Sequence, residues 1–163
     1  MQLEGSCHCG KVRFSVESNT PYPFSRCYCS VCRKLNGGGG YTINIMAEAA
    51  TLKVEGEEHL KYYRHGNNDR GAYEEDGLGF SRRHFCIHCG TMLWNRNTRY
   101  PDWIYPFASA IDTPLPVATD HRHTMVMHKP DWVEIPEGEP QYAQYPDGGI
   151  EDWHRERGLY GKL

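Results

Sequence analysis

The chain has 163 residues, the length of one compact domain. Its formal net charge is only −3 and its basic residues are scattered, so we expect no nucleic-acid partner. No apolar stretch approaches the roughly 20 residues needed to cross a bilayer, so no membrane role is expected, and nothing in the composition indicates an oligomeric state.

Apolar residues recur mostly with a period of two, which is typical of β-strands. Val12, Phe14 and Val16, for example, alternate with polar residues and predict a half-buried strand. One short helix is expected at residues 30–35, before the glycines at 37–40 end it. In chain order, strands are expected at residues 12–16, 41–45, 51–54, 59–63, 79–85, 91–94, 103–108 and 123–128. The pattern predicts a mainly β fold with little helix.

All seven cysteines fall into three tight clusters. The clusters contain C-x-C pairs and C-x2-C steps, which place thiolates close enough to share one ion. Soft thiolate sulfur favours zinc, copper(I) or iron–sulfur among the metals of proteins. The clusters are Cys7 with Cys9, Cys27 with Cys29 and Cys32, and Cys86 with Cys89.

A disulfide framework is the main alternative, but it suits small secreted chains rather than one long enough to bury a core. An odd number of cysteines would leave a free thiol, and a C-x-C pair is poorly shaped for an internal bridge. Residues 1–5 contain no basic segment and no apolar run, so no signal peptide is expected. We therefore expect metal-bound cysteines and a cytoplasmic location.

The clusters divide unevenly between two candidate sites. The first cluster precedes a strand and the third lies between two strands, the arrangement expected of two knuckles that clamp one zinc ion. The middle cluster then supplies only three sulfurs, and zinc with three protein ligands keeps a fourth position for water or substrate. A histidine or a water that completes an inert ion there is the alternative.

Three motifs of the chain resemble the glutathione-dependent formaldehyde-activating (GFA) family. They are C-x-C-G at residues 7–10, C-x-C-x2-C-R at 27–33 and F-C-x2-C-G at 85–90, and all seven sulfurs match in order. The resemblance continues through residues 110–114, with Ala-Ile-Asp and Pro, and through Lys-Pro-Asp-Trp at 129–132.

This resemblance implies a β-tent zinc-binding fold with two zinc ions. It implies that one ion is structural, and that a glutathione thiol adduct binds near the other. We expect one GFA-like zinc-binding domain over residues 1–145, with residues 146–163 as a C-terminal tail packed on the same domain. The implied ligands are Cys7, Cys9, Cys86 and Cys89 for the structural ion, and Cys27, Cys29 and Cys32 for the second ion.

One residue departs from the family pattern, because Tyr28 stands where the middle motif commonly has histidine. The middle residue of an extended C-x-C points away from its neighbours, so we expect metal binding to be kept and the substrate to change. Arg33 and Lys34 are expected to balance the thiolate charge or to pair with substrate carboxylates. Three histidines are expected mostly at the surface: His121, His123 and His128.

The charge of the three-cysteine site limits the kinds of reaction that it can catalyse. Three thiolates and one zinc(II) ion sum to −1, which makes a weaker Lewis acid than zinc held by neutral histidines. Such a site suits the binding of a thiolate against an electrophile better than the activation of water. We hypothesise a carbon–sulfur lyase-type enzyme that acts on a glutathione or other thiol adduct of a small aldehyde, with no catalytic residue assigned beyond the three cysteines. The alternatives are a non-catalytic zinc-binding interaction module and a redox sensor with free thiols in the middle cluster.

Overall fold

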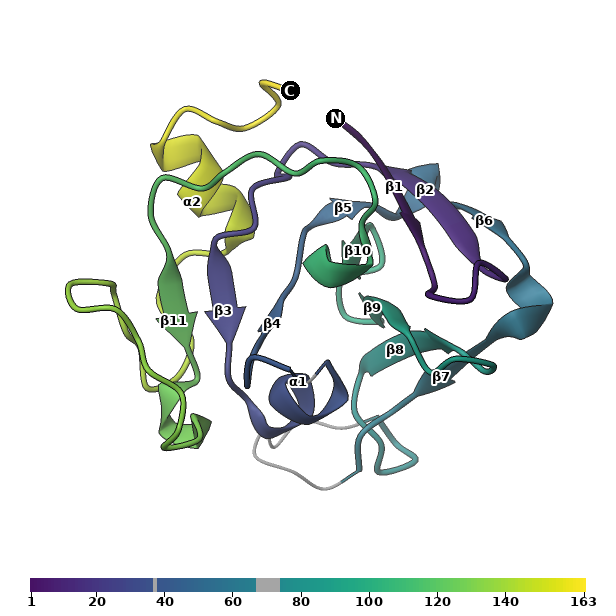
Figure 1. Ribbon diagram of the computed structural model, residues 1–163, viewed down its shortest axis with the longest axis horizontal. Helices are drawn as coiled ribbons and strands as arrows, with labels where there is room; N and C mark the ends of the chain where they lie inside the picture. Colours follow the sequence, from purple (N-terminus) through teal and green to yellow (C-terminus); the bar gives the residue numbers. More distant parts are fainter. Residues whose placement is uncertain (37, 67–73) are drawn as a thin grey trace.

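Three β-sheets form the framework of the protein (Figure 1). The computed structural model describes residues 1–36, 38–66 and 74–163. The first sheet has the order β1-β2-β6, the second β5-β10-β9-β8-β7 and the third β11-β3-β4. The mainly β fold is confirmed. Among the described residues, no helix has the length and apolar character needed to span a membrane.

The strands are β1 (Gln2–Ser6), β2 (Arg13–Glu17), β3 (Ser25–Cys27), β4 (Thr42–Ile43), β5 (Ala47–Glu48), β6 (Lys53–Glu55), β7 (Leu60–Tyr63), β8 (Ser81–Cys86), β9 (Met92–Asn97), β10 (Trp103–Pro106) and β11 (Arg122–Thr124). The α-helices are α1 (Ser30–Leu35) and α2 (Ile150–Glu156), and single 3-10 turns occur at Ala49–Thr51, Glu57–His59, Ala108–Ala110 and Val126–His128.

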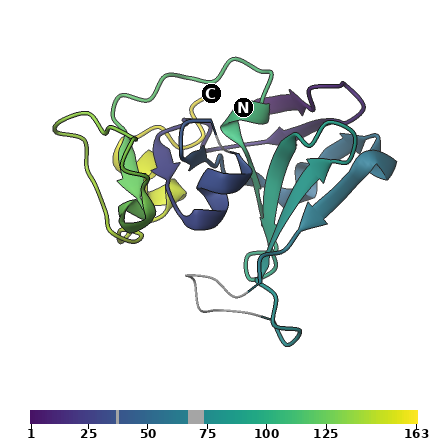
Figure 2. The same ribbon diagram turned by 60° about the horizontal axis from the view of Figure 1, so that its bottom comes forward.

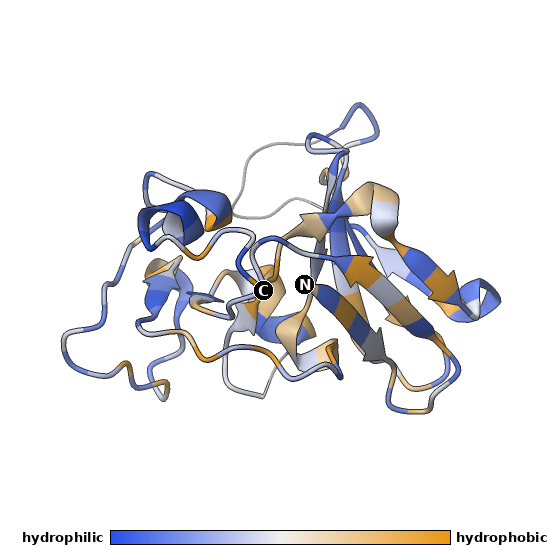
Figure 3. Ribbon diagram, turned by 90° about the horizontal axis from the view of Figure 1, so that it is seen from above, coloured by the Kyte–Doolittle hydropathy of each residue, from blue (hydrophilic) through white to orange (hydrophobic). Residues whose placement is uncertain are grey.

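The main core lies between the first sheet and the five-stranded sheet. Alternate residues of β1 and β2 point into it, so that orange and blue segments follow each other along these strands (Figure 3). Phe14 meets Trp94 edge to face, with ring centroids 5.0 Å apart. Aromatic pairs in this geometry stabilise a core beyond the area that they bury.

The third sheet and α2 lie on the opposite side of the molecule, with α1 between them and the five-stranded sheet (Figure 2). β11 pairs with β3 in parallel, although nearly a hundred residues separate them in the chain. Trp153 of α2 stacks on Phe24, which precedes β3, at a centroid distance of 3.9 Å. The C-terminal segment is therefore packed against the strand that leads to Cys27.

Several of the expected strands are shorter or displaced in the structure; β10, for example, ends at Pro106 instead of residue 108, and β6 begins at Lys53 instead of residue 51. Residues 41–45 form only the two-residue strand β4, because the Ile45 N–H turns away to bond the Pro106 carbonyl at 2.8 Å. The strand expected at 123–128 ends at Thr124, and a 3-10 turn follows.

His154 of α2 is fully buried, and its hydrogen bonds fit only the neutral ring. Its Nδ1–H donates to the Ile150 carbonyl (2.7 Å), and its Nε2 accepts from the Tyr22 N–H (3.2 Å). Burial lowers the pKa of His154 below the ordinary value. A folded-state pKa below the unfolded value of about 6.5 stabilises the fold fully above that pH, and the stabilisation is lost as the pH falls through it.

We therefore predict that the free energy of unfolding decreases between pH 7 and pH 5, and that His154 stays neutral in the folded protein at pH 6. Nitrogen-15 NMR of the ring measures its protonation directly. An imidazolium signal from His154 at pH 6 would contradict the assignment.

Candidate metal centres and the adjoining cavity

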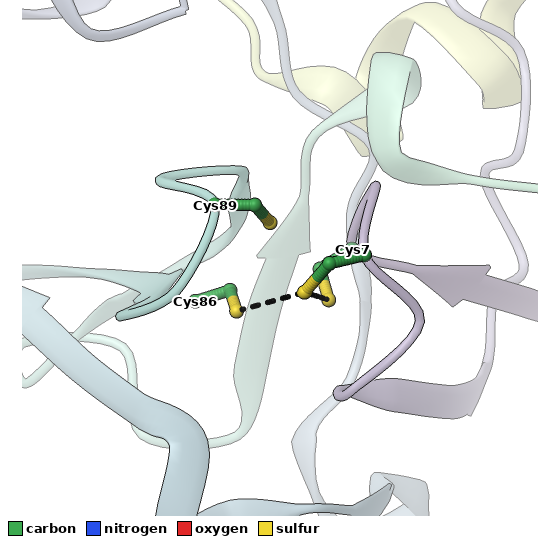
Figure 4. A group of neighbouring side chains, drawn as sticks. Cys7, Cys86 and Cys89 are labelled. Atoms are coloured by element: carbon green, nitrogen blue, oxygen red, sulfur yellow. Dashed lines mark hydrogen bonds between the residues drawn. The ribbon is translucent and has the colours of Figure 1, made fainter.

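Four cysteines from the two ends of the main core converge on one point. Cys7 and Cys9 lie in the turn after β1, Cys86 ends β8, and Cys89 lies in the turn between β8 and β9. Figure 4 shows Cys7, Cys86 and Cys89. The Sγ atoms of Cys7 and Cys9 are 3.5 Å apart, and those of Cys9 and Cys86 are 3.7 Å apart. All four sulfurs lie within 4.8 Å of one another.

The two cysteine turns have the same backbone conformation and hydrogen-bond pattern. The Gly10 N–H bonds the Cys7 carbonyl and the Gly90 N–H bonds the Cys86 carbonyl, both at 2.9 Å. Both glycines have a φ of 73°, in the left-handed region that side chains disfavour. A tetrahedral ion with zinc–sulfur bonds of about 2.3 Å separates its sulfurs by about 3.8 Å, so the observed spacing fits one such ion.

The middle cluster is built on the start of α1. Cys27 ends β3, Cys29 caps the helix by accepting the Cys32 N–H on its sulfur (3.4 Å), and all three side chains are buried. Hydrogen bonding to the Cys27 and Cys29 thiols, together with burial, raises the pKa of Cys32 well above its ordinary value. Three buried thiols this close favour the thiolate form only beside a cation, so the donor set fits a soft metal ion. The three sulfurs also lie within 4.8 Å of one another.

A cavity of about 550 Å³ adjoins the middle cluster and not the four-cysteine cluster. Cys27 of β3 and Cys32 of α1 line it, together with residues of β8, β9 and β10. The volume is within the range of small-molecule sites. The side chains that these three strands contribute all carry polar groups, and they are Ser81, Arg83, Asn95, Asn97 and Tyr105.

The sequence model of the family described as glutathione-dependent formaldehyde-activating enzyme matches residues 2–128. The chain belongs to this family. A curated GFA relative from Halomonas elongata, named "Putative glutathione-dependent formaldehyde-activating enzyme", is 51% identical over 162 residues, which are 98% of each chain. The crystal structure of a Rhodobacter sphaeroides protein has a TM-score of 0.53 at 22% identity and covers 87% of this chain and 99% of its own, which shows a shared fold.

Two tyrosines of the cavity were not found from the GFA motifs. The Tyr145 hydroxyl lies 3.3 Å from Cys27 Sγ. Burial raises the pKa of Tyr105 to about 12, so its phenol stays a neutral hydrogen-bond donor at pH 7. Tyr145 comes from the segment after the GFA motifs. Tyr105 belongs to the aromatic stretch at 103–107, whose alternating pattern favours a core position over a pocket wall, so the folded chain is needed to show that the two tyrosines share a cavity.

Tyr28, which replaces the histidine common in the GFA family, faces away from this cavity. Its hydroxyl donates to His123 Nδ1 (2.7 Å), and His123 Nε2–H donates to Glu139 Oε2 (2.5 Å). Glu139 is also 3.3 Å from Arg26 of β3. His123 is an exception to the expectation that the three histidines lie mostly at the surface, because the parallel pairing of β11 with β3 places it, fully buried, beside Tyr28. The chain of contacts holds the backbone that carries Cys27 and Cys29.

We predict that Tyr28→Phe lowers the free energy of unfolding by about 1–3 kcal/mol, because it leaves the buried His123 Nδ1 without a donor. Turnover should remain, since Tyr28 does not line the cavity. Denaturant titration and an activity assay on the same samples measure both quantities. Tyr142→Phe, at a partly exposed ring, is the control; a large loss of activity with unchanged stability in Tyr28→Phe would place Tyr28 at the substrate instead.

Other residues expected near the substrate lie elsewhere. Arg33 and Lys34 follow Cys32 in α1 but do not line the cavity. The arginines that do reach the cavity are Arg83 and Arg122.

Proposed function

We propose that the protein is a zinc-dependent enzyme of the carbon–sulfur lyase type, acting on a glutathione or other thiol adduct of a small aldehyde. The observation that carries the proposal is the different setting of the two cysteine clusters. Among the described residues, Cys27 and Cys32 of the three-cysteine cluster line the cavity of about 550 Å³ and the cysteines of the other cluster do not, and the three-cysteine cluster is also the one that lacks a fourth cysteine. An interaction module with two inert ions requires no cavity at one of them.

A zinc ion held by Cys27, Cys29 and Cys32 would supply a position at which a ligand thiolate is bound and oriented. The proposed reaction forms the bond between the thiol sulfur and the carbonyl carbon of formaldehyde, and the proton lost by the thiol ends on the carbonyl oxygen. Cleavage of the adduct is the reverse. No oxidant or reductant is consumed.

The residues of the cavity have defined tasks in this proposal. The Tyr105 hydroxyl, kept neutral by burial, donates a hydrogen bond to the oxygen of the adduct. The Tyr145 hydroxyl contacts Cys27 Sγ and restrains that side of the cluster. The cysteines need a reducing environment, so we propose that the protein acts in the cytoplasm.

Exchange spectroscopy with carbon-13 formaldehyde and glutathione tests the function. The zinc-loaded protein should speed the exchange between free formaldehyde and S-hydroxymethylglutathione at catalytic concentrations, and the rate should depend on the amount of bound zinc. Exchange that is no faster than in buffer, in a protein with two ions bound, would reject the proposed reaction for this thiol and aldehyde.

A further inference from the structure

Strand β8 carries two neighbouring arginines on opposite faces. Arg82 faces outward and reaches Glu74 with both Nη atoms, at 3.2 and 3.3 Å. Arg83 faces the cavity and is only 3% exposed. Among the described residues, no carboxylate lies within salt-bridge distance of Arg83, and its Nη1 is buried without a hydrogen-bond partner. Within the part of the chain that the structure describes, Arg82 therefore has a counter-charge and the buried Arg83 has none.

A buried, unpaired charge is costly, and proteins that retain one generally use it. The strand register places Asn95 of β9 directly opposite Arg83, on the same face of the sheet. Asn95 Oδ1 is likewise buried without a hydrogen-bond partner. An unused donor and an unused acceptor thus lie side by side in the cavity wall, a combination that matches a carboxylate next to an N–H group, as at either end of a peptide.

The remaining charges of the cavity also favour an anion. Arg122, on the opposite wall, bonds Ser25 Oγ and the Gly148 carbonyl, both at 3.3 Å, and has no carboxylate partner among the described residues. Glu151 is the one acidic residue in the lining, and its Oε1 is already bound by Arg155 at 2.6 Å. The cavity therefore offers two arginines and one neutralised carboxylate.

We propose that Arg83, with Asn95 beside it, binds a carboxylate of the thiol ligand and so selects acidic, peptide-like thiols over neutral ones. The proposal rests on the proposed function and names the group of the ligand that is recognised. Arg83 is thereby a specificity-determining residue in the wall of the cavity that Cys27 and Cys32 also line. None of the motifs that define the family contains it.

Binding of glutathione and of glutathione diethyl ester to the zinc-loaded protein tests the proposal by calorimetry. The protein should bind the acid at least about tenfold more tightly than the ester, and Arg83→Gln should remove that preference by weakening the acid alone. Arg82→Gln changes a guanidinium on the adjacent residue and should keep the preference. Equal weakening of acid and ester by Arg83→Gln, or no difference between them in the unmodified protein, would overturn the proposal.

A second variant keeps the proposal testable if Arg83→Gln does not fold. Asn95→Asp is nearly isosteric and places a carboxylate opposite Arg83, so it should remove the preference for the acid and raise the midpoint of thermal unfolding. A lower midpoint with the preference intact would count against the proposal.

S-methylglutathione, which has no free thiol, separates the carboxylate site from the proposed reaction. If S-methylglutathione binds in a way that depends on Arg83, but the protein does not catalyse the exchange of glutathione with formaldehyde, the carboxylate site stands and the proposed reaction is rejected. If the protein catalyses the exchange but Arg83→Gln leaves the binding of S-methylglutathione unchanged, the proposed reaction stands and the carboxylate site is rejected.

Discussion

Cys86→Ala is expected to destabilise the whole protein, by at least about 5 kcal/mol and about 10–20 °C in the midpoint of thermal unfolding. Cys86 is fully buried in the main core, at the end of β8, and its sulfur belongs to the group that joins the turn after β1 to the β8–β9 turn. Structural zinc contributes roughly 10–16 kcal/mol to the folding of small zinc-binding peptides, so loss of one ligand removes much of that contribution. Calorimetry and metal analysis of the purified variant measure the effect.

Val12→Ala is the matched control, because Val12 is fully buried in the same core next to Cys7 and ligates nothing. It should cost only the lost packing, about 1–3 kcal/mol, and should keep both ions. A Cys86→Ala protein with two bound ions and the stability of the Val12→Ala protein would contradict a structural role for the four-cysteine cluster.

Cys32→Ala is expected to abolish turnover while the protein remains folded. The variant should lose one of two ions, keep the ion of the four-cysteine cluster, and fall at least about a thousandfold in rate. Cys32 lines the cavity and has the thiol whose pKa is raised by its two neighbours, so its removal breaks both the metal site and the wall of the cavity. Circular dichroism, metal analysis and the exchange assay on one sample give the three results.

Val31→Ala, in the same helix and packed in the same small cluster of buried side chains, is the control for local packing. It should keep both ions and most of the activity. Full activity in Cys32→Ala with one ion bound would show that the four-cysteine cluster suffices, and the division of tasks between the clusters would be wrong.

The sequence was sufficient for those features that depend on short-range pattern. Helix α1 spans Ser30–Leu35 as expected, because Cys29 caps its first turn and Asn36 caps its C-terminal end. The cysteines group as their spacing suggested, since each knuckle is a local turn closed by its own glycine. Strand β1 was missed because one of its inward positions is Gly5, which gives no apolar signal. A Cβ at Gly5 would lie 2.4 Å from the Phe14 ring, so the close packing itself requires glycine there.

The cavity could not be read from the sequence, because its walls come from distant segments. Arg83 appears in the sequence as one member of a short basic cluster, and only the register of β8 with β9 separates it from Arg82 and sets it opposite Asn95. His123 becomes a buried partner of Tyr28 only through the parallel pairing of β11 with β3. The alternation along β8 places Ser81 and Arg83 on one face of the strand. Two polar residues at inward positions were the feature of the sequence that could have indicated a polar cavity wall.

Zinc X-ray absorption of the fully loaded protein tests the central claim, that the three-cysteine cluster binds the reacting thiol. Four and three cysteines give an average of about 3.5 sulfur neighbours per ion in the free protein. We expect glutathione to raise this average to about 4, and S-methylglutathione to leave it unchanged. An average that stays at about 3.5 with a saturating concentration of glutathione would contradict the claim.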